Sequence, residues 1–373
     1  MIPDANHYRS VFFYGMIFLM TFFLQKNLSA QSFPEAKIPG SEIRKLNSPE
    51  INQEYELQIS LPGGYSNSNK KYPVVYLMDS QWDFPLVTAL YGQQYYDGFI
   101  PEMIIVGITW GGSRPNPDSL RARDYTPTND KRLPQSGGAD KFLSFIKNEV
   151  FPFIESNYKA DKNDRTLMGC SLGGLFTMYT LFTQPQMFNR YVAASPAYSW
   201  DNVILYQYEK KYFENKLNPQ AKLFMCVGGV EKSVPGFEQL TKFLNDRHYS
   251  SLQIESRVLE NTGHSGTKGE GFARGLQFVF QRPSLKLSSS ILDQYAGKYV
   301  IDDKDFINLK VEDGMLVSYS NNGKDVLQAA SETDFYLASS FLNVHFKKDD
   351  NGNVTGFQLD RYGSSQFVKK IAE

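Results

Sequence analysis

The sequence has little of the material from which metal centres, disulfide scaffolds and nucleic-acid surfaces are made. Its 373 residues include two cysteines and four histidines, too few for a zinc ribbon or a disulfide framework. Basic and acidic residues number 39 and 40, the formal net charge is -1, and the longest basic tracts are pairs such as Lys70 and Lys71. Binding along a phosphate backbone needs clustered positive charge. We therefore expect no metal, no other cofactor and no nucleic-acid partner.

The most hydrophobic stretch covers residues 11–24. It is shorter than the roughly 20 apolar residues that cross a bilayer as a helix. The segment Leu28-Ser29-Ala30 follows it and supplies the small residues that a signal peptidase prefers. We interpret residues 1–30 as a signal peptide cleaved before Gln31; an uncleaved anchor or a misassigned start is the alternative. The interpretation predicts an exported protein, periplasmic or secreted, with no stable membrane insertion after cleavage.

Residues from about 50 to 282 alternate between strand-like and helix-like segments, within a domain expected at residues 31–283. Residues 54–61 are apolar at every second position, which is typical of a half-buried strand. Residues 73–78 and 103–109 are continuous apolar runs, typical of strands covered on both faces. Residues 139–158 carry apolar side chains at helical spacing. Further strands are predicted at 165–168, 190–194, 221–227 and 252–259. This alternation predicts an α/β fold, a mainly parallel sheet with helices on both faces.

The pattern changes after residue 283. The Ser-rich segment 284–290 is predicted as a linker. From 291 to 373 no helix is predicted, and short alternating runs are separated by turn signals such as Asp313-Gly314. We expect a small all-β domain at residues 291–373, built as an antiparallel meander.

Residues 169–173 read Gly-Cys-Ser-Leu-Gly, a G-x-S-x-G pattern. The string alone is weak, but an apolar strand precedes it and the helical segment 174–183 follows, which is the strand, sharp turn and helix of a nucleophile elbow. We interpret Ser171 as a catalytic nucleophile. The backbone N–H of Leu172, with that of Ser80 or Gln81, would then stabilise the oxyanion. A Gly-rich connection with an ordinary serine is the alternative.

A serine nucleophile needs a base, and the base needs an orienting acid. His264 follows the last strand of the predicted sheet, at the edge where catalytic groups of open α/β sheets gather; a turn-stabilising histidine is the alternative. Glu231 follows the strand 221–227 and lies between nucleophile and base in the sequence, so it is the predicted acid. Glu260 and Glu270 flank His264 and could take this role, or no acid acts.

Several aromatic residues follow predicted strands, in segments expected at the same edge of the sheet. We interpret them as a surface on which an aromatic acyl group, a catechol or a sugar ring stacks. Packing in the core is the alternative. The residues are Trp82, Trp110, Tyr125, Tyr198 and Trp200.

The two cysteines, Cys170 and Cys226, are expected to be buried free thiols. Their strands should lie two apart in the sheet, beyond the roughly 7 Å between Cα atoms that a disulfide permits.

Six strings of the chain resemble the Putative esterase family of α/β-hydrolases, which includes enterochelin esterases, related siderophore hydrolases, feruloyl esterase modules and S-formylglutathione hydrolases. The resemblance implies an α/β-hydrolase sheet with Ser171 as nucleophile and His264 as base. Some siderophore hydrolases of the family work with a Ser-His dyad, which leaves the role of Glu231 open. The strings are YPVVYLMD from 72, IIVGI from 104, RARDYTP from 121, RTLMGCSLGGLF from 165, ASPAYSWD from 194 and TGHS from 262.

The resemblance also implies that Arg123 and Asp124 line the substrate pocket. A buried ion pair that braces the loop 110–138 is an equal alternative. The chain departs from the family where Ser80 replaces a frequent glycine and Cys170 a frequent histidine. Neither change removes a catalytic group.

Together these patterns predict an exported serine carboxylic-ester hydrolase that acts through a covalent acyl-enzyme on an aromatic, siderophore or glycan ester. Acyl transfer by the same residues, or a non-catalytic carbohydrate-binding or scaffold protein, are the alternatives. The oligomeric state and the role of the C-terminal domain leave no readable signal in the sequence.

Overall fold

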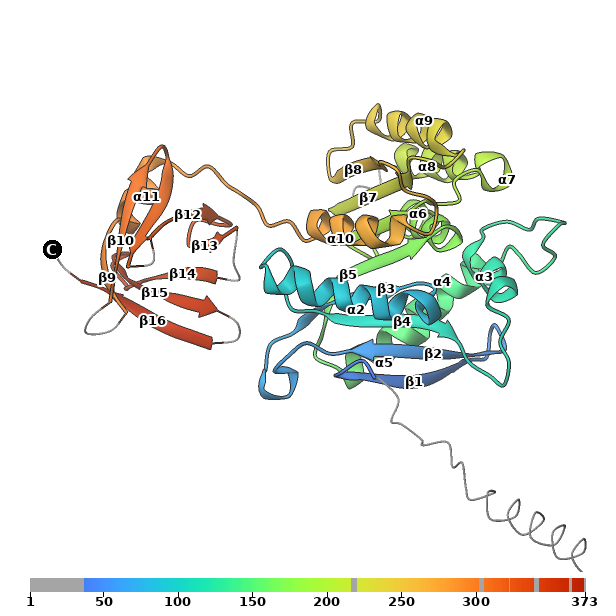
Figure 1. Ribbon diagram of the computed structural model, residues 1–373, viewed down its shortest axis with the longest axis horizontal. Helices are drawn as coiled ribbons and strands as arrows, with labels where there is room; N and C mark the ends of the chain where they lie inside the picture. The colour runs from blue at the N-terminus through green and yellow to red at the C-terminus, as the bar shows by residue number, and fades with distance from the viewer. Residues whose placement is uncertain are drawn as a thin grey trace, which may run out of the picture. The chain divides into compact units, whose positions relative to one another are not determined.

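The computed structural model describes residues 37–215, 220–301, 305–321, 323–338, 342–361 and 364–371. The signal peptide predicted at residues 1–30 lies outside this range. Within the described residues, an α/β domain is followed along the chain by a C-terminal β-barrel domain (Figure 1). No helix of the described residues has both the length and the hydrophobicity to cross a membrane.

The α/β domain contains an eight-stranded sheet in the order β1-β2-β4-β3-β5-β6-β7-β8. Strands β3 to β8 are parallel, and β1 and β2 add an antiparallel edge. All of the predicted strands are present. The strands are β1 (Ser41–Ser48), β2 (Gln53–Ser60), β3 (Tyr72–Leu77), β4 (Ile104–Trp110), β5 (Ala160–Cys170), β6 (Arg190–Ala194), β7 (Ala221–Gly228) and β8 (Leu252–Leu259).

The first strand, β1, was not predicted, because it carries almost no hydrophobic alternation. It is an edge strand whose side chains are mostly exposed, including Ile43. By contrast, every residue of β4 is buried. A strand covered on both faces needs a continuous apolar run, whereas an edge strand in water does not. The sequence signal is therefore strongest in the middle of the sheet.

Helices cover both faces of the sheet, as predicted. Helices α2 and α10 pack against each other on one face, and α4, α5, α6 and α8 lie on the other (Figure 1). The helix predicted over 139–158 is interrupted by the π-helical turn η2, which ends two residues before Pro152, a residue that cannot donate a backbone hydrogen bond. The bounds are α2 (Ser80–Tyr96), α3 (Pro117–Tyr125), α4 (Ala139–Phe145), η2 (Ile146–Val150), α5 (Phe151–Asn157), α6 (Leu172–Thr183), α7 (Trp200–Val203), α8 (Leu205–Glu214), α9 (Val234–Asn245) and α10 (Thr267–Val279), with a short 3-10 turn, η1 (Tyr65–Asn67).

The topology brings the predicted site residues to one end of the strands. Because β3 to β8 are parallel, their carboxyl ends all lie at the same end of the sheet. These strands are followed by the segments that carry the predicted catalytic and aromatic residues. Ligands of open α/β sheets bind at this edge.

The C-terminal domain is a closed barrel in the order β10-β11-β12-β13-β14-β15-β16-β9. The prediction of an antiparallel β domain is confirmed, and Asp313 and Gly314 form the predicted tight turn, both with positive φ. The prediction that no helix occurs here is wrong, because α11 (Ser289–Tyr295) precedes the first strand and buries Leu292 and Tyr295 in the barrel core. The strands are β9 (Gly297–Val300), β10 (Phe306–Glu312), β11 (Met315–Ser320), β12 (Gly323–Ala329), β13 (Asp334–Leu337), β14 (Leu342–Lys348), β15 (Val354–Arg361) and β16 (Ser364–Lys370).

Candidate active site

Ser171 occupies a sharp turn between β5 and α6. Its backbone angles are φ 60° and ψ -118°, a region that non-glycine residues rarely adopt. The turn requires small neighbours: a Cβ on Gly169 would lie 2.5 Å from the carbonyl carbon of Gly173. A Cβ on Gly173 would lie 3.2 Å from that of Met78. The strand, turn and helix predicted around Ser171 are therefore present. Glycine is sterically required at position 169, and a side chain at position 173 would be in tight contact with Met78.

Two helices begin beside each other at this turn. Leu172 is the first residue of α6, and Ser80 and Gln81 are the first residues of α2. No backbone acceptor within the described residues bonds the N–H groups of these three residues. Unpaired N–H groups at helix N-termini carry partial positive charge and attract anions. The arrangement can therefore bind an oxyanion next to Ser171.

His264 is held by Glu231. The imidazole Nδ1 lies 2.7 Å from Oε2 of Glu231, and the His264 side chain is about half exposed, at 48%. The other carboxylate oxygen, Oε1, accepts hydrogen bonds from the Gly228 N–H (2.8 Å) and from the Ser195 hydroxyl (2.6 Å). Partial burial opposes ionisation of Glu231, but these hydrogen bonds outweigh it and lower its pKa. An ionised carboxylate on Nδ1 leaves Nε2 free to take a proton.

Ser171 and His264 come from strands that are three apart in the sheet, and no hydrogen bond joins their side chains in this structure. Ser195 lies between the turn of Ser171 and the pair of Glu231 and His264. The Ser171 N–H donates to the carbonyl of Ala194, at 3.0 Å, and the next residue, Ser195, binds the carboxylate that holds His264. Ser195, which binds the carboxylate of Glu231, therefore follows β6, the strand next to the one that carries Ser171. Catalytic hydrogen bonds are often long in ligand-free structures and shorten when substrate binds.

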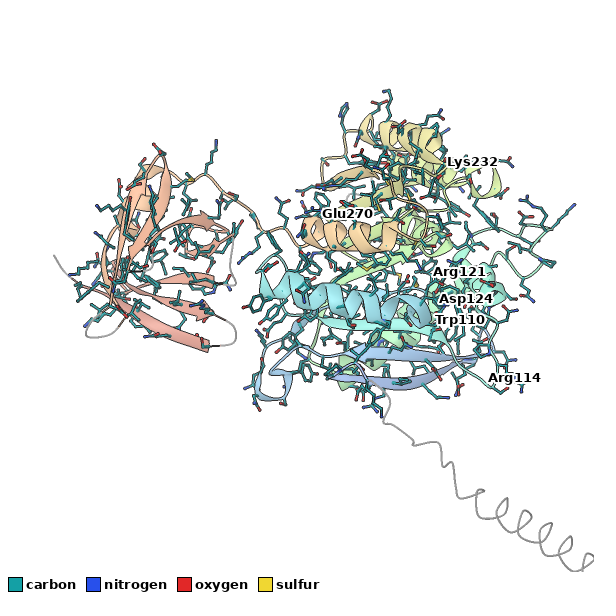
Figure 2. The ribbon with its side chains drawn as sticks, in the orientation of Figure 1. Trp110, Arg114, Arg121, Asp124, Lys232 and Glu270 are labelled. Atoms are coloured by element: carbon teal, nitrogen blue, oxygen red, sulfur yellow. The ribbon has the colours of Figure 1, made fainter. Side chains whose placement is uncertain are left out.

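A cluster of charged residues surrounds the start of α2. Arg121 forms a bidentate ion pair with the buried Asp79 at 3.1 and 2.8 Å, and Lys268 binds the buried Asp83 at 2.7 Å. Burial raises the pKa of both aspartates, although the two cations oppose the shift. The ion pairs fix the first turn of α2, and the Lys268 pair ties α2 to α10, the helix that follows His264. Figure 2 marks Arg121 at this edge of the sheet.

Of the predicted aromatic surface, Trp82 is exposed. Its side chain is 49% exposed. The guanidinium of Arg121 and the ammonium of Lys268 lie 5.7 and 5.8 Å from its ring. Tyr198 and Trp200 are half-buried and hydrogen-bond to neighbouring loops through Ser233 and Thr128.

The prediction that Trp110 and Tyr125 stack on a ligand is wrong. Both are buried: the Trp110 N–H donates to Asp124 at 2.7 Å, and the Tyr125 hydroxyl accepts from the backbone N–H of Asp79. Trp110 is the last residue of β4 and Tyr125 the last residue of α3, and their rings pack against each other in the core.

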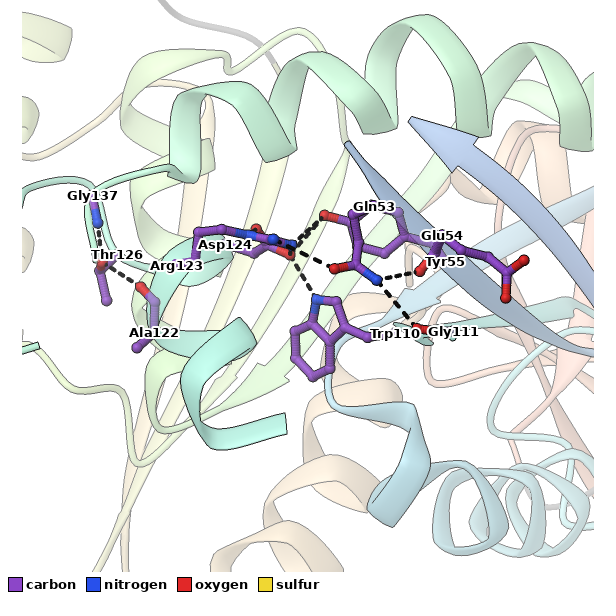
Figure 3. Close-up of polar contacts among 10 residues, drawn as sticks. All are labelled: Gln53, Glu54, Tyr55, Trp110, Gly111, Ala122, Arg123, Asp124, Thr126 and Gly137. Carbon is purple, nitrogen blue, oxygen red and sulfur yellow. Dashed lines mark hydrogen bonds and ion pairs between the residues drawn. The ribbon is translucent and has the colours of Figure 1, made fainter. Parts of the chain in front are cut away.

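The contacts of Arg123 and Asp124 do not favour the pocket-lining role that the resemblance implies. Arg123 pairs with Asp124, whose carboxylate binds Tyr55 and Trp110 as well (Figure 3). Asp124 is 1% exposed. This network joins α3 to β2 and β4, so the alternative of a buried ion pair that braces the loop is the one observed.

The sequence profile of the Putative esterase family matches residues 48–269. The chain belongs to this family. The matched range covers the predicted nucleophile, base and acid, and it ends before the C-terminal barrel. The family assignment therefore concerns the α/β domain.

Several curated relatives are named as esterases of siderophores. The ferri-bacillibactin esterase BesA of Bacillus subtilis is 32% identical over 52% of this chain and 72% of its own. The siderophore triacetylfusarinine C esterase of Aspergillus fumigatus is 30% identical over 48% of this chain and 63% of its own. The crystal structure of the BES protein from Bacillus cereus superposes with a TM-score of 0.60 and 27% identity, over 66% of this chain and 97% of that one. This esterase-family chain thus shares fold and sequence with proteins named for siderophore ester cleavage.

Sequence reasoning missed several polar residues at the site. Asp79, Arg121 and Ser195 lie within the strings that carry the family resemblance but received no role. Ser195 directly follows β6, so the rule that directed attention to Glu231 after β7 also applies to it. Thr267 and Lys268 left no signal beyond their closeness to His264 in the sequence.

In the described residues, no group of three or more His, Cys, Asp and Glu side chains could hold a metal ion. The two cysteines are buried and free, as predicted.

Proposed function

We propose that this esterase-family protein is a serine hydrolase of carboxylic esters that works through an acyl-enzyme. The Ser171 hydroxyl attacks the ester carbonyl while His264 Nε2 takes its proton. The N–H groups of Leu172 and of Ser80 or Gln81 bind the oxyanion. Collapse of the tetrahedral intermediate breaks the ester C–O bond, and His264 returns the proton to the leaving alcohol.

In the second half of the reaction, the deacylation, water takes the place of the Ser171 hydroxyl as nucleophile. His264 takes a proton from water, hydroxide adds to the acyl carbonyl, and the Ser171 oxygen leaves with the proton. Glu231 keeps Nδ1 protonated and stabilises the imidazolium in both halves. The observation that carries the proposal is the 2.7 Å contact between His264 and Glu231, together with a nucleophile turn that needs Gly169.

For the substrate, we propose an aromatic, siderophore or glycan ester. Trp82 offers an exposed aromatic face at the start of α2. Two cations lie near this face, which suits an electron-rich or anionic aromatic ring. The relatives named as siderophore esterases support the same choice. We also propose export, from the hydrophobic segment at residues 11–24.

The test of the hydrolase proposal is Ser171→Ala. The variant should lose turnover of p-nitrophenyl esters and covalent labelling by a fluorophosphonate probe, because both need the hydroxyl. Ser199→Ala is the matched control, since Ser199 is an exposed serine at the same edge of the sheet. Undiminished turnover in purified Ser171→Ala, or equal loss in the control, would refute the proposal. Product analysis would separate hydrolysis from acyl transfer.

A further inference from the structure

Two buried hydroxyl groups, those of Ser195 and Thr267, lie behind the pair of His264 and Glu231. Ser195 is 3% exposed and Thr267 is 0% exposed. The Ser195 Oγ lies 2.6 Å from Glu231 Oε1 and 3.1 Å from Thr267 Oγ1. The Thr267 hydroxyl in turn donates to the backbone carbonyl of His264 at 2.6 Å. A chain of contacts therefore runs from the carboxylate of Glu231 back to the main chain of His264.

Each hydroxyl has one proton, so the direction of these bonds can be assigned. A carboxylate is a stronger acceptor than a neutral hydroxyl, and its contact with Ser195 is the shorter one. Ser195 therefore gives its proton to Glu231, and Thr267 gives its own to His264. With the Gly228 N–H also bound to Oε1, this oxygen is fully occupied and Oε2 is left for the imidazole.

The backbone of Ser195 adds an independent observation. Its φ is 37°, in the left-handed region that non-glycine residues seldom occupy. Its N–H is held by the carbonyl of Cys226 at 2.7 Å. Strained backbone persists only where the surroundings determine it, and it gathers at functional sites.

We propose that Ser195 and Thr267 are positioning residues, which hold the carboxylate of Glu231 and the loop of His264 in the geometry that the reaction needs. This inference rests on the proposed function. Neither residue touches the substrate. Their loss should lower kcat, because the imidazole is misaligned, and leave KM almost unchanged, because the substrate surface at Trp82 is intact.

Variants can separate positioning from mere packing. Ser195→Gly removes the hydroxyl and accepts the positive φ, so it should fold. Thr267→Val removes the second hydroxyl at nearly constant volume, and Thr267→Ser is its matched control, which keeps the hydroxyl. We expect kcat to fall about 10–100-fold in Ser195→Gly and Thr267→Val, as for loss of one hydrogen bond to or near a charged group. KM should stay within about threefold, and Thr267→Ser should keep kcat within about threefold of wild type.

The measurements are steady-state kinetics on a p-nitrophenyl ester, the rate of fluorophosphonate labelling of Ser171, and thermal unfolding. If the folded Ser195→Gly and Thr267→Val proteins keep wild-type kcat, or if Thr267→Ser loses as much as Thr267→Val, the positioning role is wrong. If the wild type itself is not labelled at Ser171, the proposed function fails instead. A Ser195→Gly protein that does not fold leaves the Thr267 pair to decide.

Discussion

Replacing Glu231 by glutamine should damage the enzyme more than replacing it by alanine. Oε1 of Glu231 accepts two hydrogen bonds, from Ser195 and from Gly228. The amide oxygen of a glutamine must occupy that position, because an NH2 group there would face two donors. The NH2 group then points at Nδ1 of His264 and donates to it. This forces the imidazole proton onto Nε2, the atom that has to act as the base.

The expected size follows from these contacts. Loss of a hydrogen bond between charged groups costs about 1.5–3 kcal/mol, which is a factor of roughly 10–150 in kcat. Glu231→Ala should lose only this factor in kcat, since water can bind Nδ1 in either tautomer of the imidazole. Glu231→Gln adds the wrong tautomer and should approach the roughly 10,000-fold loss in kcat that replacing the triad aspartate by asparagine causes in a serine protease.

The assay is kcat for a p-nitrophenyl ester at pH 8, with thermal unfolding to confirm that each variant is folded. Glu260→Gln is the control, because Glu260 is a carboxylate close to His264 in the sequence, whereas the imidazole Nδ1 is bound by Glu231. Equal activity of Glu231→Gln and Glu231→Ala would show that the tautomer argument is wrong. Wild-type activity in both would mean that Ser171 and His264 work as a dyad.

Three further outcomes test the placement of single residues. Tyr125→Phe should lower the free energy of unfolding in urea by about 1–3 kcal/mol, because the buried N–H of Asp79 loses its acceptor, while KM stays unchanged; a changed KM with unchanged stability would contradict the buried position. Trp82→Ala should do the reverse, raising KM for aromatic esters more than for acetyl esters, with unfolding shifted by less than about 0.5 kcal/mol; equal KM changes for both ester types would count against a stacking surface. Expression of the whole chain in a bacterium with a general secretion pathway should yield periplasmic protein that begins at Gln31, and intact N-terminal residues in mass spectrometry would exclude cleavage there.

Much of the fold could be predicted because burial on both faces leaves a strong signal. The middle strands are continuous apolar runs, and the nucleophile turn needs Gly169 for a steric reason that other α/β elbows share. The same rule, that chemistry follows the carboxyl ends of parallel strands, selected Glu231 and His264, which the structure brings into contact.

The failures also have physical causes. Trp110 ends β4, as a residue at the rim of the site would, but its ring packs against Tyr125 of α3, and the sequence pattern of neither element indicates this contact. The roles of Ser195 and Thr267 depend on which hydroxyl meets which acceptor, and this is decided by tertiary contact alone. The barrel is closed by pairing of β16 with β9, a contact between the two ends of the domain that local alternation cannot reveal.

Closure of the barrel has a consequence for how this chain meets other chains. In the described residues the barrel offers no free strand edge, so addition of a foreign strand can start only at β1 or β8, the two margins of the open sheet. Both margins carry charged side chains, Glu42, Arg44 and Lys45 on β1 and Glu255 and Arg257 on β8. Such charges discourage edge-to-edge association. The same sequence features that hid β1 from prediction therefore protect the folded protein from aggregating through its sheet.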